Sequence, residues 1–133
     1  MGTKGFIDNA GRAISVANAV GTAGNINTLG TVSSGAVALP SPTNGGPATT
    51  KVTISANTTF TLPKPFAGAT VKLIVEQDAT GSRLATWSTT HGGYVHFPTA
   101  TSALSVTAAY VDRVVFVSDD GVGWNATLQK HLG

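Results

Sequence analysis

Hydrophobic and polar residues alternate along the chain from Lys51 onward, which is the pattern of strands with one buried face. The clearest case is 69–77 (ATVKLIVEQ), where Val71, Leu73 and Val75 fall on one face of the expected strand. Turn sequences recur roughly every 8–12 residues, which is typical of an antiparallel β-sandwich or jelly roll. The expected strands are 51–55, 58–62, 69–77, 83–88, 94–97, 103–107, 112–118 and 122–129, with 31–39 before them. We expect a short hairpin or bend between 51–55 and 58–62, and 83–88 as the partner of 69–77.

The first fifty residues have a different pattern. No charged residue lies between Arg12 and Lys51, and Phe6 is the one aromatic residue before Phe60. With so few bulky side chains, the segment buries too little apolar area to offset its ordering entropy. We therefore expect an extended N-terminal arm over 1–50, which orders only against a partner subunit or the body of its own domain. Prolines and glycines in 40–50 mark the expected boundary with an antiparallel β-sandwich domain over 51–133. The apolar residues expected to dock the arm are Phe6, Ile14, Val16, Val20, Ile26, Leu29 and Val32.

The composition of the 133 residues narrows the class of protein. Charged residues make up 11% of the chain and the formal net charge is +2. The eight basic residues are scattered singly, which argues against a dedicated nucleic-acid binder, because such proteins cluster Lys and Arg. No apolar run is long enough for a membrane-spanning helix. The chain has no cysteine, which excludes disulfides and cysteine-based zinc sites.

Residues that could carry catalysis or bind a metal are few and scattered. The spacing of His91, His96 and His131 does not bring two imidazoles to one face of a strand. The adjacent carboxylates of Asp119 and Asp120 are too few for the roughly six to eight oxygen ligands of calcium. The sequence also lacks the G-x-S-x-G pattern of a serine nucleophile. We therefore expect no enzymatic activity, no cofactor and no metal.

Three aromatic residues, Trp87, Tyr94 and Trp124, fall on expected strands near turns. Aromatic faces can stack on sugar rings, but large aromatics also fill sandwich cores and subunit interfaces, and we favour this structural role. The sequence 78–81 has Asp and Gly at the preferred positions of a type I turn. Across this turn we expect an ion pair between Asp78 and Arg83, with the guanidinium stacked on Trp87.

Two segments resemble a pattern found in virion proteins of tailed bacteriophages. The first, 67–87 (AGATVKLIVEQDATGSRLATW), has a strand ending in Gln-Asp, a Thr-Gly-Ser-Arg turn and a strand ending in Trp. The second, 111–124 (VDRVVFVSDDGVGW), is similar to the final hairpin of the same proteins. The residues that carry the resemblance are Gln77, Asp78, Thr80, Gly81, Arg83, Trp87, Asp112 and Trp124. In such proteins these residues have a structural role. The resemblance therefore implies no catalytic role, and it implies a structural turn motif made of Gln77, Asp78, Thr80, Gly81, Arg83 and Trp87.

The resemblance implies a virion structural protein, and two places in the particle stay open. One is a capsid decoration (cement) protein, a homotrimer that docks on the major capsid protein through its arm and β-domain. Many weak contacts, repeated over many copies, would then supply the avidity. The other is a tail-fibre or tail-tip receptor-binding module that contacts host glycans through Trp87, Tyr94 or Trp124. Neither role involves nucleic acid, a membrane or a cofactor.

Overall fold

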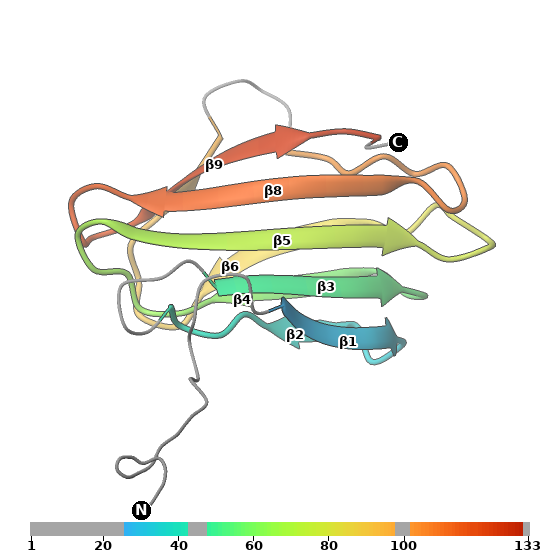
Figure 1. Ribbon diagram of the computed structural model, residues 1–133, viewed down its shortest axis with the longest axis horizontal. Helices are drawn as coiled ribbons and strands as arrows, with labels where there is room; N and C mark the ends of the chain where they lie inside the picture. The colour runs from blue at the N-terminus through green and yellow to red at the C-terminus, as the bar shows by residue number, and fades with distance from the viewer. Residues whose placement is uncertain (1–25, 43–47, 98–101, 132–133) are drawn as a thin grey trace, which may run out of the picture.

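The computed structural model describes residues 26–42, 48–97 and 102–131, and these residues form an all-β fold (Figure 1). The expectation of an all-β fold is confirmed. The strands are β1 (Ile26–Val32), β2 (Ala36–Ala38), β3 (Ala48–Ile54), β4 (Thr58–Leu62), β5 (Ala69–Gln77), β6 (Ala85–Thr89), β7 (Val95–His96), β8 (Val111–Ser118) and β9 (Trp124–Gln129).

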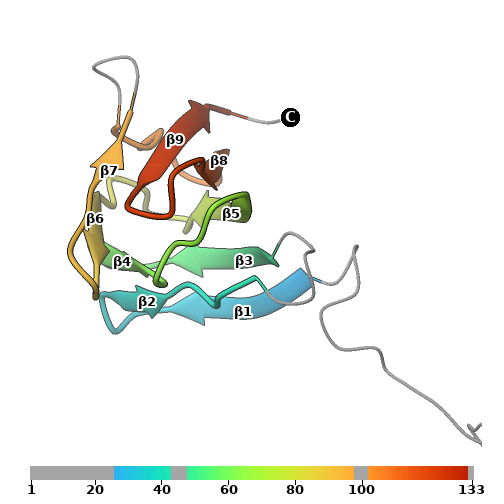
Figure 2. The same ribbon diagram turned by 90° about the vertical axis from the view of Figure 1, so that its left-hand side faces the viewer.

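The strands form two sheets that enclose one core. The larger sheet has the order β1-β3-β5-β8-β9-β7, and the smaller sheet has the order β2-β4-β6. Figure 2 looks along the strands and shows the smaller sheet beside the larger one. Trp87 of β6 meets Phe116 of β8 with ring centroids 5.7 Å apart, so side chains of the two sheets pack against each other.

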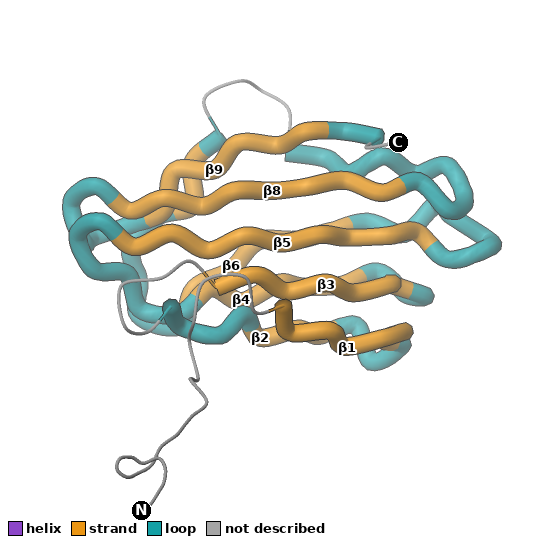
Figure 3. Tube along the Cα trace, in the orientation of Figure 1, coloured by secondary structure: helices purple, strands orange, loops and turns teal. Residues whose placement is uncertain are grey.

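From β1 to β6 the chain alternates between the two sheets, so that it winds as a coil of stacked layers (Figure 3). Each layer contributes one strand to each sheet, and its strands run parallel to those of the next layer: β1 with β3, β3 with β5, β2 with β4, and β4 with β6. Residues paired between β2 and β4, or between β3 and β5, are 23 positions apart in the sequence.

This parallel pairing corrects two expectations and decides a third between its two alternatives. Five of the seven strand pairings are parallel, so the described domain is neither an antiparallel sandwich nor a jelly roll. In addition, β6 pairs with β4 instead of β5. Of the hairpin or bend expected between 51–55 and 58–62, the bend is the correct alternative, because residues 55–57 carry the chain from β3 into the other sheet. Alternation along a strand predicts its buried face, but it contains no information about which strand is its partner.

The strands β8, β9 and β7 complete the larger sheet. β8 runs antiparallel to β5 and β9 runs antiparallel to β8, so the expected final hairpin is confirmed. The short β7 pairs parallel with β9. The segment 103–107, which we expected to be a strand, has no ladder partner, although Leu104 is buried in the core.

The described parts of the expected arm, 26–42 and 48–50, lie within the domain. β1 and β2 extend the two sheets, and β3 begins at Ala48, so no boundary lies at residue 50. This part of the chain thus orders against the body of its own domain, one of the two alternatives above. The expectation for 1–25, including Phe6, Ile14, Val16 and Val20, lies outside the described residues.

The core follows the expected alternation. Buried and half-buried residues alternate along the whole of β5, and Val71, Leu73 and Val75 are buried as expected. The strands β3, β4 and β8 show the same alternation over most of their length. The largest side chains of the core are Trp124, Phe60 and Phe116.

Candidate functional site

The structural turn motif lies at the end of β5, where Gln77 is the last residue of the strand. The Gln77 side chain is buried and donates through Nε2 to the carbonyl oxygens of Arg83 at 2.8 Å and Ser105 at 2.9 Å. Its Oε1 accepts from the backbone N–H of Arg83 at 3.0 Å. One amide therefore joins the 78–83 turn to the segment 103–107, and no polar atom of Gln77 is left for a ligand.

Asp78 and Arg83 close the same turn from its outer side. The Arg83 guanidinium donates to both oxygens of Asp78, through Nη2 at 2.8 Å and Nε at 3.2 Å, which confirms the expected ion pair. Asp78 Oδ1 also accepts from the backbone N–H of Gly81 at 2.9 Å. The hydrogen bonds from Arg83 hold the pKa of the Asp78 carboxyl below its usual value of 3.8, and the N–H groups of Gly81 and Thr80 act in the same direction.

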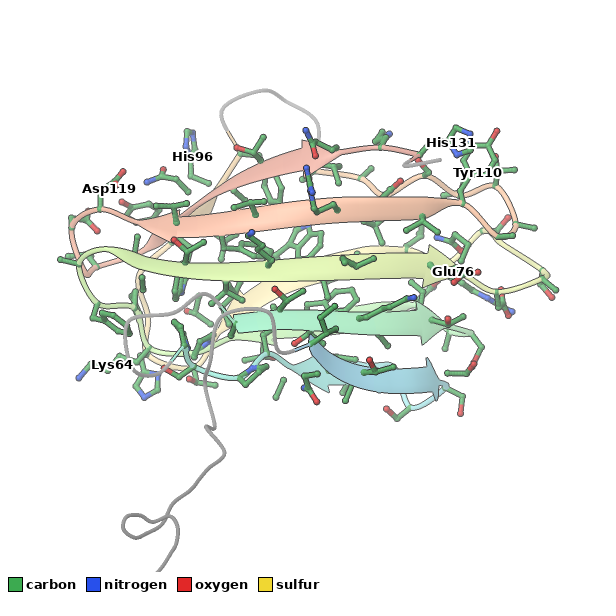
Figure 4. The ribbon with its side chains drawn as sticks, viewed as in Figure 1. Lys64, Glu76, His96, Tyr110, Asp119 and His131 are labelled. Atoms are coloured by element: carbon green, nitrogen blue, oxygen red, sulfur yellow. The ribbon has the colours of Figure 1, made fainter. Side chains whose placement is uncertain are left out.

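Asp112, from the second resembling segment, is buried beside this turn. Its Oδ2 accepts from the N–H of Ser105 at 2.5 Å, and its Oδ1 accepts from the N–H of His131 at 2.7 Å. The His131 ring stacks on Tyr110 with centroids 3.7 Å apart. Figure 4 labels Glu76, Tyr110 and His131 at this end of the molecule. The turn, the segment 103–107 and the C-terminal residues are thus tied together here.

Trp124 is part of the hydrophobic core, and Trp87 packs against it. Trp124 is fully buried, and its indole N–H donates to the Pro63 carbonyl oxygen at 3.0 Å. The expectation that Trp124 contacts a glycan is therefore wrong, because no face of its ring reaches the solvent. Trp87 is half-buried, stacks on Phe60 at 5.3 Å and donates to the Ser102 carbonyl oxygen at 3.0 Å.

Tyr94 is the one residue of the proposed glycan-contact set with a large exposed surface, at 38%. Its hydroxyl donates to Asp120 Oδ2 at 2.9 Å. The Asp120 carboxylate also accepts from the N–H groups of Val122 and Gly123, and these backbone bonds, followed by the Tyr94 bond, hold the pKa of Asp120 below its usual value. The hydrogen bond to Asp120 also raises the pKa of Tyr94.

Two exposed apolar side chains, Phe66 and Val122, belong to the same end of the molecule as Tyr94. The backbone of Phe66 lies against Gly121, and the carbonyl of Val122 lies against Gly93, the residue before Tyr94. Figure 4 labels Asp119, His96 and Lys64 at this end, opposite the turn motif. We call Phe66, Tyr94, Asp120 and Val122 the Tyr94 end. Sequence reasoning identified Tyr94 but missed Phe66 and Val122, because local alternation does not place the 66–68 and 119–123 turns side by side.

Of the residues expected to dock the arm, three are described: Ile26, Leu29 and Val32 of β1. Ile26 is 53% exposed and Leu29 is 38% exposed, whereas Val32 packs against the core. β1 is the edge strand of the larger sheet. The structure therefore brings these three residues to one edge of the larger sheet.

Within the described ranges, no three His, Asp or Glu side chains lie close enough together to hold a metal ion. In the same part of the chain there is no helix that is both long and apolar enough to cross a membrane. Comparisons of the chain with protein-family models, with curated proteins and with solved structures give no match.

Proposed function

We propose that this protein is a structural component of a tailed-bacteriophage virion, namely a capsid decoration protein that docks on and stabilises the head shell. The main support is the structural role of the residues that carry the resemblance to phage virion proteins. Gln77, Asp78, Arg83 and Asp112 hydrogen-bond to backbone or to one another, and the Trp124 ring fills the core. Side chains that are engaged in this way stabilise the domain, as expected of structural residues.

The surface of the described domain also fits a docking role. Phe66, Tyr94 and Val122 are exposed together at the Tyr94 end, and exposed apolar residues that lie together often mark a protein interface. Few charged residues are present, so desolvation of the surface in a protein interface costs little. In the proposed assembly, the domain and its N-terminal residues contact the major capsid protein. Three copies surround each local three-fold axis, so that weak contacts add up over the shell.

A phage that lacks this gene tests the proposal. The mutant particles are expected to infect normally after mild handling, but to lose infectivity much faster than wild type on heating or osmotic shock. Supplying the full chain in trans should restore resistance. Equal heat and osmotic resistance of mutant and wild-type particles would overturn the proposal.

A second candidate function, a tail-fibre or tail-tip module that binds host glycans, is favoured by the Tyr94 end. An exposed aromatic ring next to a carboxylate is a common way to bind a sugar, since the ring stacks on the sugar face and the carboxylate accepts from hydroxyl groups. Tyr94→Ala should then lower adsorption of the phage to its host at least tenfold. The matched control is Tyr110→Ala at the opposite end of the molecule. Unchanged adsorption of the Tyr94→Ala phage would exclude this role.

A further inference from the structure

The first layer of the coil, made of β1 and β2, has an open outer side. Each strand is at the edge of its sheet, and Figure 2 shows the two edges at the same side of the molecule. Within the described ranges, no strand pairs with their outer backbone groups. Ile26 and Leu29 are exposed on this side. An open edge of this kind is normally covered, because it otherwise pairs with other chains.

The strands of the first layers repeat with a spacing of 23 residues, which holds for β2 with β4, for β3 with β5 and for β1 with β3 up to the bulge, whereas β4 and β6 are 27 positions apart. Val37 of β2 pairs with Phe60 of β4, and Thr28 of β1 pairs with Lys51 of β3, each 23 positions further on. The residues that follow β2 and β4 repeat as well, because Leu39-Pro40-Ser41-Pro42 has the same spacing from Leu62-Pro63-Lys64-Pro65. Leu39 and Leu62 are both buried. The spacing therefore marks equivalent positions in successive layers.

The same spacing continues toward the N-terminus. The sequence 13–16 (AISV) is equivalent to 36–39 (AVAL) and 59–62 (TFTL), so Ile14 matches Val37 and Phe60. In the larger sheet, Leu29 and Gly30 lie opposite Val52 at the bulge in β1, and the equivalent of Leu29 one step earlier is Phe6. Large apolar residues thus recur in the sequence at the 23-residue spacing in both series of positions.

The length of chain before β1 also fits one more layer. Twenty-five residues precede β1, slightly more than one spacing of 23. The ten residues 16–25 would link the new layer to β1, and nine residues, 39–47, link β2 to β3. The connection is therefore one residue longer than the one that the chain already uses for the same step.

We propose that residues 3–15 of the same chain form a further layer of the coil, with 3–9 parallel to β1 and 13–15 parallel to β2. Ile14 then packs on Val37, and Phe6 packs beside Leu29. The layer covers the edge that β1 and β2 leave open. An intramolecular layer of this kind forms in the isolated chain, whether or not the protein is part of a virion.

Cysteine pairs test this pairing directly, because the chain has no cysteine of its own. Ser15 would lie directly opposite Ala38, which is exposed, and Ala38 pairs with Thr61. Neighbouring strands are ~4.8 Å apart, within the range for a disulfide, whereas strands two steps apart are separated by ~9.6 Å, beyond it. The test pair is Ser15→Cys with Ala38→Cys. Ala38→Cys with Thr61→Cys is the positive control, and Ser15→Cys with Thr61→Cys is the mismatched control.

Under mild oxidation of the purified full chain, we expect the test pair and the positive control to form disulfides at least tenfold faster than the mismatched control. Non-reducing electrophoresis and peptide mass mapping should place each bond within one chain. A positive control that forms while the test pair reacts no faster than the mismatched pair would overturn the proposal. Disulfide-linked dimers of the test pair would also overturn it and would identify the N-terminal residues of a second copy as the occupant of the edge.

Discussion

At the scale of single residues, the side chains of Gln77 and Asp112 take the place of a strand partner. Ser105 shows this most clearly, because its carbonyl accepts from Gln77 and its N–H donates to Asp112. The segment 103–107 has the alternation of a strand, yet these side chains satisfy both backbone groups of Ser105 without a ladder. Gln77 and Asp112 are therefore part of the backbone hydrogen bonding of the domain.

Replacing Gln77 by Leu should destabilise the domain by about 2–4 kcal/mol, since it leaves two carbonyl groups and one N–H group without their partner. Urea unfolding followed by tryptophan fluorescence measures this loss. Glu76→Ala, one residue earlier on the opposite face of β5, is the control and should change stability by less than about 0.5 kcal/mol. A loss for Gln77→Leu no larger than for the control would contradict this role.

Because of the ion pair between Asp78 and Arg83, we expect the stability of the domain to fall at acidic pH. The pKa of Asp78 is lower in the folded state, so its ionised form stabilises the fold above the unfolded-state pKa. This contribution is lost as the pH falls through the folded-state pKa. Between pH 5 and pH 2, Asp78→Asn should therefore lose less stability than wild type. The urea midpoint measured across this range tests it, and parallel losses in both proteins would refute it.

At the scale of the elements, turns decide how the strands assemble. Gly81 has a φ of +74°, and a Cβ there would lie 2.6 Å from the Val106 carbonyl oxygen. Gly30 has a similar φ of +69°, but nothing lies within 4 Å of its Cβ position. Substitutions at the two glycines therefore distinguish the cost of backbone strain alone from the added cost of a clash between the turn and the neighbouring segment.

Gly81→Ala should be clearly more destabilising than Gly30→Ala. For Gly30→Ala we expect only the strain of a left-handed residue, about 1–2 kcal/mol. Gly81→Ala adds a clash with backbone atoms that cannot move away without breaking the Ser82 N–H to Val106 carbonyl bond. Thermal unfolding of the two variants side by side measures the difference. Equal melting temperatures would show that the turn does not pack as described.

The sequence was sufficient to predict most strands, the buried face of β5, the last hairpin and the Asp78–Arg83 pair. These features depend on local alternation and on turn residues within a few positions of one another. It was not sufficient to predict which strands pair, because parallel partners such as Val37 and Phe60 are 23 positions apart. The 23-residue spacing was the available signal for the layers, and comparing 36–42 with 59–65 would have revealed it. Burial of Trp124 depends on its contact with distant Pro63 and could not be read locally.

At the scale of the whole molecule, the described residues form a coil of layers with two distinct ends, and β1 and β2 lie at the edge where the described coil begins. The residues that carry the resemblance to phage virion proteins stabilise turns and the core. Exposed apolar residues lie on β1 and at the Tyr94 end. A small, weakly charged domain of this kind gains binding strength by repetition of contacts. The proposed role as a decoration protein therefore depends on many copies bound to one particle.

The number of copies per virion tests this claim most directly. Quantitative mass spectrometry of purified particles, with isotope-labelled peptides of this chain and of the major capsid protein, gives the ratio of the two. We predict hundreds of copies per particle, in a simple integer ratio to the capsid protein. Only a handful of copies per particle, or none, would contradict the proposed role on the head shell.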